Sequence, residues 1–598
     1  MADFFLICSD NPQIVDHARA NARRRLLEMA PDGLIDEAGG PAWSLITARN
    51  PSVPYAAAAD PRGAAVVIGS TFDADGTKIS DLRSPSEACR IQAMRDYCLR
   101  LNYGAALSVG ESDVLVAADW LGLYPVYDYG DDSAFIVTSM PGLLRCHKGF
   151  RAAVDIHGLV TILLLAHSCL GHTMFQGVSR LRPGHLLKYG PGRRLNREEV
   201  LLGAGPSAPR DIGETVEAFD AVLRRSVGSA AREGARSVYL SGGLDSRLVA
   251  GYLRQSVTGE LSALTFGDRR DMEMRAAARV TTVLGMAHER APIDMNDFPA
   301  FAGRAIEADA MSCGLYSLNE YSFSETPRPL LLTGFLGDVT MGAGHVGWGR
   351  ESSLDRHTFQ AMFSSVNAWG LSPGIVREIV RADDIDDVLL HVWRRLRDEY
   401  DSYSGPPWQK SWWFDLYHRQ RFLVGNGCKI MTLRSWPVLP YVVPDLLRLL
   451  RALPLPLVAG RRAQIELILR KFPELARLPL ARAIDRQWWH LVPRKPRFWF
   501  RFQDRVKESL SWHWYDKFDP WEPRVFLRTF DFNGPGWKAL REEARSRADD
   551  ADAWLNKDIV LQLIPPASTD ARLRRAIVDA AGRKALLGAV LCCRRHFS

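Results

Sequence analysis

The feature that most constrains the fold of this chain is a glycine turn between an apolar run and an amphipathic segment. Residues 237–240, with the sequence SVYL, have the composition of a buried strand. They lead directly into SGGLDS at 241–246. Apolar residues then recur at the spacing of one helix face: Leu244, Leu248, Val249, Tyr252 and Leu253. The order strand, glycine turn, helix predicts one unit of a parallel sheet covered by helices.

The turn itself has the chemistry of an anion site. Two adjacent glycines, Gly242 and Gly243, let the backbone approach a ligand without an intervening side chain. Unpaired N–H groups of the first helical turn, with the hydroxyls of Ser241 and Ser246, favour a phosphate. Asp245 alone would repel that phosphate, so we expect it to hold a divalent cation that bridges to phosphate oxygens. The P-loop differs, because its GxxxxGK[ST] pattern contains a lysine that this turn lacks.

Length and composition place the chain among multidomain globular proteins. At 598 residues it exceeds the size of one ordinary core, so we expect two or more domains. Apolar residues make up 47% and charged residues 24%, which excludes a disordered or fibrous chain. A net charge of +7 over this length does not by itself indicate nucleic acid as a partner.

The sequence contains no signal for a membrane or for secretion. Apolar stretches such as residues 159–165 are far shorter than a membrane span. The N-terminus has neither a basic region nor a cleavage site, and it is typical of a first strand. The nine cysteines are scattered without a CxxC pair, so neither a zinc site nor a disulfide framework is predicted. We therefore expect a cytoplasmic protein with no membrane partner.

A stretch rich in glycine and proline at 202–211 is typical of a linker, and it predicts domains at 1–205 and 206–598. Upstream, short alternating runs at 114–117 and 135–137 predict antiparallel sheets. Downstream, strands at 263–266 and 330–332 flank a helix at 271–284 that Gly285 ends, which predicts a parallel sheet. The expected fold class is α/β combined with α+β: an antiparallel sheet sandwich, then a parallel α/β domain with a helical extension.

A second glycine turn repeats the first arrangement. The strand at 330–332 runs into TGFLGD at 333–338, and MGAG follows at 341–344. The carboxyl ends of parallel strands share one edge of the sheet, so Asp245 and Asp338 are expected to emerge together there. Two carboxylates that face a polyphosphate are suited to hold magnesium. For Asp338 taken alone, the alternative is a capping residue in a surface loop.

These turns resemble those of a known family. SGGLDS is similar to the PP-loop of the N-type ATP pyrophosphatases, which split ATP into AMP and pyrophosphate. SGGLDS, then LTFG at 264–267, then TGFLGD follow the order found in the synthetase domain of the asparagine synthetase family. The resemblance implies that Asp245 and Asp338 bind Mg2+. It implies two further sets of ATP contacts: Ser241, Gly242, Gly243 and Ser246 for pyrophosphate, and the backbone of Leu240, Phe266 and Gly334 for adenosine.

The upstream half is similar to the glutaminase-like, Ntn-type N-terminal domain of the same family. The segments that carry this likeness are DWLGLYPVY at 119–127, TMFQGV at 173–178 and LRPG at 181–184. Glutamine-hydrolysing members use a cysteine as the mature N-terminal residue, whose α-amine serves as the base. Here residues 2–4 are Ala, Asp and Phe, and Cys8 is expected to be a core residue of the first strand. We therefore expect a degenerate domain that does not release ammonia from glutamine.

The downstream half also departs from the family pattern. β-Lactam synthetases have a tyrosine three residues before the second aspartate, and asparagine synthetases have a glutamate; this chain has Phe335, which leaves the general base unassigned. Glu466 stands where the family has the lysine that neutralises pyrophosphate. Lys495, Arg461 and Arg462, in a strongly basic stretch at 461–507, are the candidates to replace it. The alternative for each is a solvated basic surface.

The region from 488 to 515 is also dense in aromatic residues: Trp488, Trp489, Phe498, Trp499, Phe500, Trp512, Trp514 and Tyr515. Interleaved basic and aromatic side chains suit either single-stranded nucleic acid or an extended peptide, and core packing is the alternative. Because of the domain pairing we favour a peptide and expect no nucleic acid. His418, Arg419 and Arg421 are further polar candidates, for which an exposed helix surface is the alternative.

The combined features lead to one hypothesis for the function. Members that keep both domains but lose the N-terminal cysteine resemble β-lactam synthetases and lasso peptide cyclases. We interpret the chain as an ATP-dependent lasso peptide macrolactam synthetase. It would adenylate a side-chain carboxylate of a leaderless precursor peptide and close the ring with the α-amine of that peptide.

The resemblance implies as partners the precursor peptide, a leader-binding protein and a leader peptidase. Three alternatives remain. The first is an asparagine or β-lactam synthetase-like amidoligase for a small molecule. The second is a PP-loop enzyme that modifies RNA, and the third is an inactive scaffold that only binds peptide.

Overall fold

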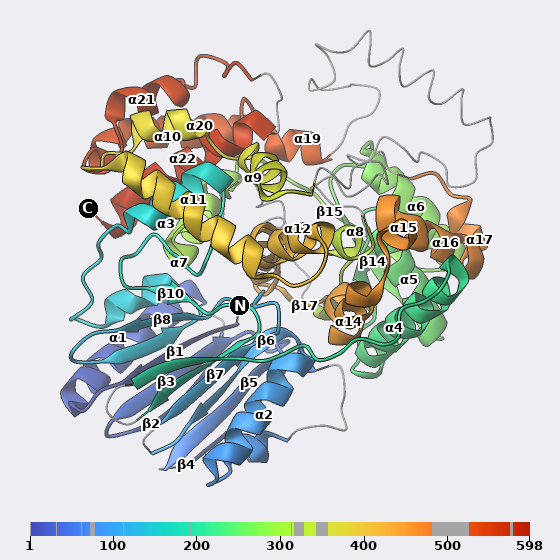
Figure 1. Cartoon of the computed structure of the whole chain (residues 1–598), viewed down its shortest axis with the longest axis horizontal. Helices are drawn as coiled ribbons and strands as arrows, with labels where there is room; N and C mark the ends of the chain where they lie inside the picture. Colours follow the sequence, from blue (N-terminus) through green and yellow to red (C-terminus); the bar gives the residue numbers. More distant parts are fainter. Residues whose placement is uncertain are drawn as a thin grey trace.

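The N-terminal part of the chain is a sandwich of two six-stranded antiparallel sheets (Figure 1). The computed structural model describes residues 2–30, 33–60, 62–71, 78–111, 113–190, 194–312, 314–315, 328–342, 357–480, 525–573 and 578–597. The strand orders are β10-β8-β9-β1-β3-β2 and β12-β11-β7-β6-β5-β4. The strands are β1 Ala2–Cys8, β2 Leu34–Gly40, β3 Trp43–Arg49, β4 Tyr55–Asp60, β5 Gly63–Thr71, β6 Leu101–Val109, β7 Val114–Ala118, β8 Tyr127–Gly130, β9 Phe135–Thr138, β10 Ser179–Arg180, β11 His185–Gly190 and β12 Arg194–Glu199.

The two-residue period of β1 explains why the sheets stack. Phe4 and Leu6 belong to the core between the sheets, whereas Phe5 and Ile7 belong to the core on the other face. Helix α1 (Pro12–Met29) covers that outer face, and helix α2 (Glu87–Arg100) covers the second sheet (Figure 1). The predicted first strand and the predicted strands at 114–117 and 135–137 are therefore confirmed as β1, β7 and β9.

The downstream part contains a five-stranded sheet of order β15-β14-β13-β16-β17, in which every neighbouring pair is parallel. Helix α6 ends at Leu284, and its C-cap residue Gly285 adopts the left-handed conformation with φ 59°. The predicted strands at 263–266 and 330–332 and the predicted helix are thus confirmed, and with them the fold class. The elements are α4 Ile212–Arg232, β13 Ser237–Tyr239, α5 Leu244–Ser256, β14 Ser262–Phe266, α6 Met272–Leu284, β15 Ala287–Ala291, β16 Arg328–Leu332, α8 Gly337–Thr340 and β17 Ser435–Val438.

The strand order places a topological switch point between β13 and β16. From β13 the chain moves outward through β14 and β15, and then it returns to β16 on the other side of β13. In open parallel sheets, ligands bind at the carboxyl ends of the strands beside such a point. The two glycine turns follow β13 and β16, so both lie at this place.

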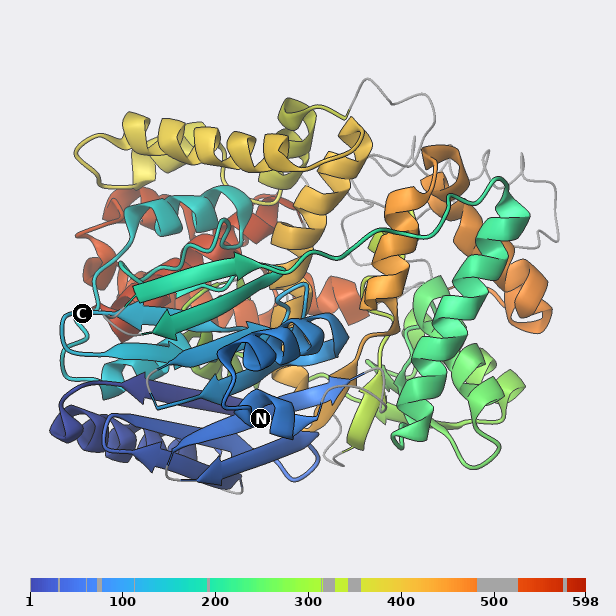
Figure 2. The same cartoon turned by 60° about the horizontal axis from the view of Figure 1, so that its bottom comes forward.

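The C-terminal helices return to the N-terminal sandwich. Leu586 and Val590 of the last helix lie in the same core as Phe5 and Ile7 of β1. Residues 200–211 contain no helix or strand and run across the molecule from β12 to α4 (Figure 2). Because both large cores mix residues from the two halves, the division at residue 205 stays a prediction. None of the described helices has the length and apolar character needed to cross a membrane.

Of the remaining helices, some form a layer above the sandwich, α12 lies between this layer and the parallel sheet, and α14 to α17 lie beside α4, α5 and α6 at the parallel sheet (Figure 1). They include α3 Ile156–Leu165, α7 Phe298–Asp309, α9 Phe359–Asn367, α10 Pro373–Ile379, α11 Ile385–Ser402, α12 Pro407–Asp415, a π-helix at Leu416–Gln420, α13 Arg421–Met431, α14 Pro444–Ala452, α15 Leu455–Val458, α16 Arg462–Lys471, α17 Pro473–Ala476, α19 Val525–Phe530, α20 Pro535–Ser546, α21 Lys557–Leu563 and α22 Val578–His596.

Candidate functional site

The two glycine turns pack directly on one another. A Cβ atom added to Gly334 would lie 2.5 Å from the backbone nitrogen of Ser246. One added to Gly337 would lie 2.7 Å from the Cβ of Asp245. Such contacts are possible only for glycine, because real Cβ atoms do not approach other atoms so closely. The structure therefore brings Asp245 and Asp338 together, as the two-turn pattern predicts.

The first turn leaves the N-terminus of α5 open. Gly243 is the N-cap residue, and no side chain caps the helix. Gly242 has φ 75°, and a Cβ there would lie 2.5 Å from the Cβ of Ala276 on α6. The hydroxyls of Ser241 and Ser246 lie 3.2 Å apart and also accept backbone N–H groups of the turn. These four residues thus form a compact cradle of backbone and hydroxyl donors around a helix N-terminus.

Arg247 anchors this cradle, and no pattern in the sequence singles it out. Its guanidinium is fully buried and donates hydrogen bonds to the carbonyl of Gly242 and to three carbonyls beyond α16. Those are the carbonyls of Leu475, Leu478 and Pro479, at 2.8–3.0 Å. An arginine on a helix is usually solvated, so its role becomes visible only when the segment at 475–479 is packed beside the turn.

Asp245 is held by side chains from α16 and its approach. Its Oδ1 accepts a hydrogen bond from Nε2 of Gln464 at 2.6 Å and also pairs with the guanidinium of Arg461. The Oε1 of Gln464 accepts from Nε of Arg461 at 2.6 Å. Tyr441 donates to the backbone carbonyl of Asp245 at 2.9 Å. Gln464 and Tyr441 are site residues that the sequence analysis missed.

The structure distinguishes two of the three candidate cations, Arg461 and Arg462. Arg461 reaches Asp245, whereas Arg462 is exposed and donates to the carbonyl of Pro456 at 3.4 Å. Lys495 lies outside the described residues. Glu466 pairs with Arg470 at 3.2 Å on α16. Arg461 is thus the described member of the three that stands at the two glycine turns.

The position of Arg461 depends on the glycine-rich MGAG segment. Arg461 itself has a left-handed backbone, with φ 63°, and its N–H donates to the carbonyl of Gly342 at 3.2 Å. Gly342 has φ 94°, and a Cβ there would lie 1.7 Å from the carbonyl oxygen of Val458. The segment before α16 can therefore approach the second turn only because residue 342 is glycine. Strained non-glycine backbone of this kind is concentrated at functional sites.

Asp338 is buried close to the charge of Asp245, and both effects disfavour its ionised form. It lies in the first turn of the short helix α8, whose N-cap residue Leu336 also has a left-handed backbone with φ 64°. Burial, and next the charge of Asp245, raise the pKa of Asp338 to about 6. The charge of Arg461 and a hydrogen bond from the N–H of Val339 act in the opposite direction. A divalent cation between the two carboxylates would remove the repulsion that raises this pKa.

A third carboxylate, Asp415, lies close enough to contribute to the raised pKa of Asp338. It ends α12, and Nε1 of Trp412 on that helix donates to the carbonyl of Val339 at 3.1 Å. Asp415 is 1% exposed, its Oδ2 accepts from Gln420 at 3.1 Å, and its Oδ1 has no hydrogen-bond partner within the described part of the chain. Burial raises its pKa above the ordinary value. Asp415 is therefore a buried carboxylate with a free oxygen beside the site.

A π-helix, Leu416–Gln420, follows Asp415. His418, Arg419 and Arg421 are 3%, 3% and 2% exposed, so the alternative of an exposed helix surface is wrong. Arg421 donates to the carbonyl of Gly122 at 2.9 Å and therefore belongs to the junction with the sandwich. Single π-turns of this kind are frequent at functional sites.

The predicted adenosine contacts lie at the same edge of the sheet. The N–H of Leu240 donates to Leu264 at 2.9 Å, and its carbonyl accepts from Oγ1 of Thr265 at 2.7 Å. The backbone of Leu240 is thus engaged with β14, and one carbonyl lone pair is left. The ring of Phe266 packs on Tyr239, with centroids 4.7 Å apart, and Tyr239 packs on Phe335 at 5.9 Å. These three rings form an apolar wall, in which Tyr239 was not foreseen.

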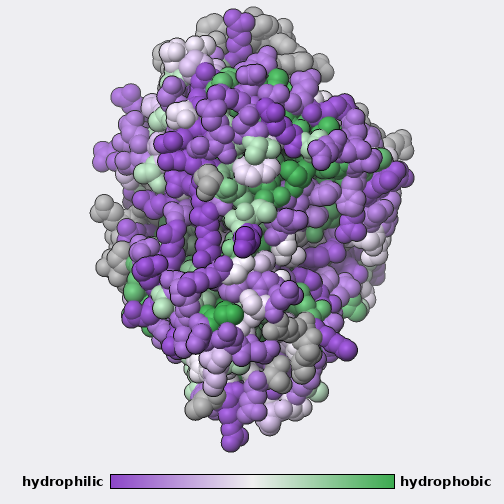
Figure 3. All heavy atoms as spheres, turned by 90° about the vertical axis from the view of Figure 1, so that its left-hand side faces the viewer, coloured by the Kyte–Doolittle hydropathy of each residue, from purple (hydrophilic) through white to green (hydrophobic). Residues whose placement is uncertain are grey.

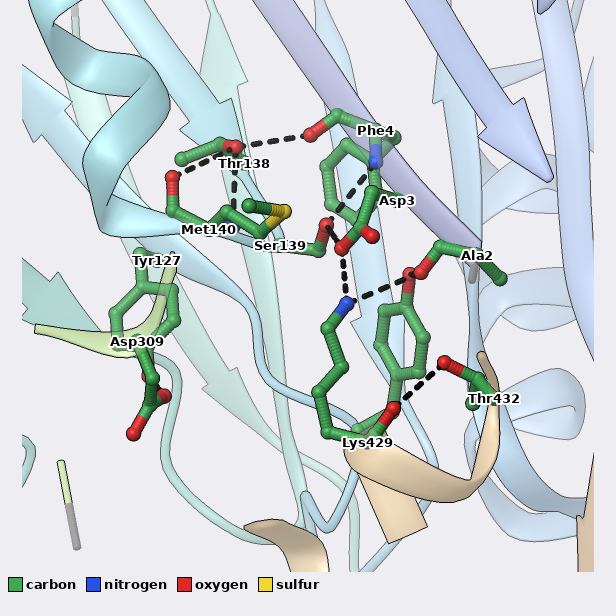
Figure 4. Close-up of polar contacts among 11 residues, drawn as sticks. Ala2, Asp3, Phe4, Tyr127, Thr138, Ser139, Met140, Asp309, Lys429 and Thr432 are labelled. Atoms are coloured by element: carbon green, nitrogen blue, oxygen red, sulfur yellow. Dashed lines mark hydrogen bonds and ion pairs between the residues drawn. The ribbon is translucent and has the colours of Figure 1, made fainter. Parts of the chain in front are cut away.

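At the start of β1, Asp3 forms an ion pair with a lysine from α13 (Figure 4). Lys429 of α13 donates to the carbonyl of Ala2 at 3.1 Å and pairs with the fully buried carboxylate of Asp3. Ser139 donates to Oδ1 of Asp3 at 2.7 Å. Cys8 ends the same strand, and burial raises the pKa of its thiol to about 12, which makes it a poor nucleophile. The structure thus places no nucleophilic thiol at the described start of the chain.

Comparison with known proteins identifies one matching family. Residues 218–397, under a third of the chain, match the family model for asparagine synthase, and this range includes both glycine turns. A search of curated proteins found no match. The glutamine phosphoribosylpyrophosphate amidotransferase from B. subtilis, complexed with ADP and GMP, is 13% identical. That match covers 49% of this chain and 66% of the other, just under two thirds of its length, with a TM-score of 0.22.

A second solved structure, described as the allosteric regulatory enzyme of purine biosynthesis, is 11% identical. Its match covers 48% of this chain and 80% of the other, also with a TM-score of 0.22. Structural likenesses with so low a TM-score say nothing about the function of this chain. Inferences about its function rest instead on the family match and on the geometry of the site.

Proposed function

We propose that this chain closes an amide bond within a single peptide. Residues 218–397 match the family model for asparagine synthase, and this match indicates an ATP-dependent carbon–nitrogen ligase. The peptide would be a leaderless precursor, and the product a lasso-type macrolactam. The observation that carries this proposal is the close approach of Asp245 and Asp338 at the switch point. The ion pair between Asp3 and Lys429 at the start of β1 supports it. The thiol of Cys8 in the described first strand is buried and its pKa is raised to about 12, which supports a reaction whose nitrogen comes from the substrate peptide itself.

The residues present fit ATP and Mg2+. The N–H groups at the start of α5, with Ser241 and Ser246, would hold the β- and γ-phosphates, and Arg461 would neutralise them. Oδ2 of Asp245 and the carboxylate of Asp338 would hold Mg2+, which favours one or two protein carboxylates plus phosphate oxygens. When bound, the metal would supply charge neutralisation at the phosphates. The rings of Tyr239, Phe266 and Phe335 would provide the apolar surface for adenine.

The chemistry would proceed in two steps. An oxygen of a side-chain carboxylate of the peptide attacks the α-phosphorus of ATP, and the bond to pyrophosphate breaks. The α-amine of the same peptide then attacks the acyl carbon, loses a proton and displaces AMP. The free Oδ1 of Asp415 is the described carboxylate oxygen that suits this proton, because its raised pKa makes it a stronger base than an ordinary aspartate.

The partners follow from the same proposal. The precursor peptide would reach the site after a leader-binding protein and a leader peptidase have acted on it. Nucleic acid and membrane are not expected partners. A small-molecule amidoligase, of the asparagine or β-lactam synthetase type, is the second candidate, since the family match supports any ATP-dependent amide formation.

The test is a direct assay of ring formation. The purified protein is incubated with Mg2+, ATP and the core peptide encoded nearest to its gene, and the products are analysed by mass spectrometry and nucleotide chromatography. The proposal expects a peptide that has lost one water and an equal amount of AMP. Formation of ADP, or a requirement for glutamine or ammonia, would refute it. Turnover of a small amino acid without the peptide would favour the second candidate.

Replacing Arg461 by methionine is expected to weaken the first step. Loss of a charged contact to phosphate corresponds to a fall of about 10- to 100-fold in ATP–pyrophosphate exchange. Arg462→Met is the matched control, because Arg462 is exposed and does not reach Asp245. Equal effects of the two substitutions would show that Arg461 has no specific role.

Replacing Asp415 by asparagine is expected to separate the two steps. ATP–pyrophosphate exchange should continue, whereas ring closure should fall by about 10²- to 10³-fold, as for loss of a general base. The acidic limb of the pH profile for ring closure, where the base becomes protonated, should also change. Asp401→Asn is the control, since Asp401 lies on the exposed end of α11. If exchange and ring closure fall together in Asp415→Asn, the assignment of Asp415 as the base is wrong.

A further inference from the structure

A pocket is lined by residues at the start of α3 and in and just before the first half of α11. Figure 1 shows these two helices on the side of the molecule away from the parallel sheet. The volume of the pocket is about 510 Å³, which is within the range of pockets that hold small ligands or a few residues of a peptide. It joins the N-terminal part of the chain to the downstream part, because α3 and α11 come from different halves. Nothing in the proposed reaction uses it.

The wall of the pocket is acidic. Asp383, Asp384 and Asp387 line it, and Arg394 is the one arginine or lysine among its described lining residues. Two nearby arginines are engaged elsewhere: Arg377 pairs with Asp386 at 2.6 Å, and Arg381 with Asp552 at 2.8 Å. Among the described residues, no arginine or lysine forms an ion pair with Asp383 or Asp387. The pocket therefore has an excess of negative charge in a chain whose net charge is +7.

Two histidine rings form a second side of the pocket. His157 and His391 line it, and their ring centroids lie 4.9 Å apart. Burial lowers the pKa of His157, and the neighbouring histidines add to this effect, while Asp155 opposes it. A lowered pKa favours the uncharged form of the His157 ring. Flat imidazole rings beside carboxylates suit a guanidinium group, which stacks on rings and donates hydrogen bonds in its plane.

The floor of the pocket is apolar. Ile156, Val388 and Leu390 line it, and Leu390 is 41% exposed. The space-filling view of this side of the molecule shows apolar atoms gathered within a largely hydrophilic face (Figure 3). A ligand that covers this floor needs an apolar side chain as well as a positive charge. A free cation or a single arginine would leave the floor exposed.

We propose that this pocket binds a partner polypeptide through a segment in which arginine stands beside a bulky aliphatic residue. The carboxylates and the imidazole rings hold the guanidinium, and the aliphatic side chain covers Ile156, Val388 and Leu390. The inference stands on the pocket alone and does not require the proposed reaction. It assigns the face of α3 and α11 to recruitment of a partner, away from the ATP site.

Binding of a defined probe tests this directly. The probe is a fluorescein-labelled peptide, acetyl-Ala-Leu-Arg-Leu-Arg-Ala-amide, and the control peptide carries citrulline in place of arginine. Fluorescence anisotropy gives Kd for the full-length protein and for two variants. Asp383→Asn/Asp387→Asn removes two wall charges and keeps Asp384, the N-cap of α11. Asp386→Asn removes a charge from the same helical turn that does not line the pocket.

The expected result is binding of the arginine peptide that weakens about tenfold in the double variant and changes less than about twofold in Asp386→Asn. Hydrogen exchange should slow at the start of α3 and in the first half of α11 when the peptide is bound. The proposal is overturned if the citrulline peptide binds equally well. It is also overturned if spermidine competes as well as the peptide, if both variants behave alike, or if the protein binds only itself. None of these readings depends on ATP turnover.

Discussion

Replacing Asp338 by asparagine is expected to abolish AMP formation and, in the absence of metal, to stabilise the fold above pH 6. The activity falls because Mg2+ loses one of two protein carboxylates, and we expect a decrease of about 10³-fold or more in ATP–pyrophosphate exchange. The stability rises because a buried carboxylate next to Asp245 is costly when it is ionised. Its pKa is raised from 3.8 to about 6, which corresponds to about 1–3 kcal/mol at neutral pH.

The sign of the pH dependence follows from the raised pKa. The folded state binds the proton of Asp338 more tightly than the unfolded state, so this group favours folding at low pH. That contribution is lost as the pH rises from about 4 to about 6. The asparagine variant has no such loss. The stability difference between the variant and the natural protein should therefore be small at pH 4 and reach its maximum near pH 7.

Urea unfolding at several pH values, without metal, measures this difference. The natural protein should gain stability when Mg2+ and ATP are added, whereas Asp338→Asn should gain much less. Two outcomes would contradict the metal assignment: normal AMP formation by the variant, or a variant that is less stable than the natural protein at pH 7. A variant that loses activity but gains stability is expected when the replaced carboxylate serves function at the expense of stability.

The parts of the site that were predicted from the sequence are those that local patterns encode. SGGLDS and TGFLGD each follow an apolar run, so the strand, the turn and the position of Asp245 and Asp338 could be placed from neighbouring residues alone. Parallel pairing of β13 with β16 then brings the two carboxylates to one edge. The antiparallel strands were found for the same reason, because the short apolar runs of β7 and β9 are visible in a short window.

The residues that were missed act through contacts between distant segments. Arg247 depends on carbonyls more than 200 positions away, and Asp415 on the position of α12 beside α8. The ion pair of Asp3 with Lys429 joins positions 426 residues apart. No periodicity or spacing signals such pairs, since the chemistry of each residue alone is ordinary. The roles of Lys495 and of the aromatic region at 488–515 stay predictions, because both lie outside the described residues.

Replacing Gly334 by alanine is expected to disable the enzyme through packing alone. The added Cβ would lie 2.5 Å from the nitrogen of Ser246 and 3.0 Å from the carbonyl carbon of Asp245, both of which are backbone atoms and cannot rotate away. The two turns must separate, which should cost about 1–3 kcal/mol of stability. A displacement of this kind at a positioned reactive group lowers the rate by about 10²-fold or more.

Gly243→Ala provides the matched comparison within the same site. Gly243 has φ −72°, which alanine adopts freely, and an added Cβ would meet only Oγ of Ser241, at 3.4 Å. This variant should keep its stability within about 0.5 kcal/mol and retain most of its ATP–pyrophosphate exchange. Thermal unfolding and exchange assays on both variants give the comparison. If Gly334→Ala is as active as Gly243→Ala, close contact between the two turns is not required, and the shared metal site of Asp245 and Asp338 has to be abandoned.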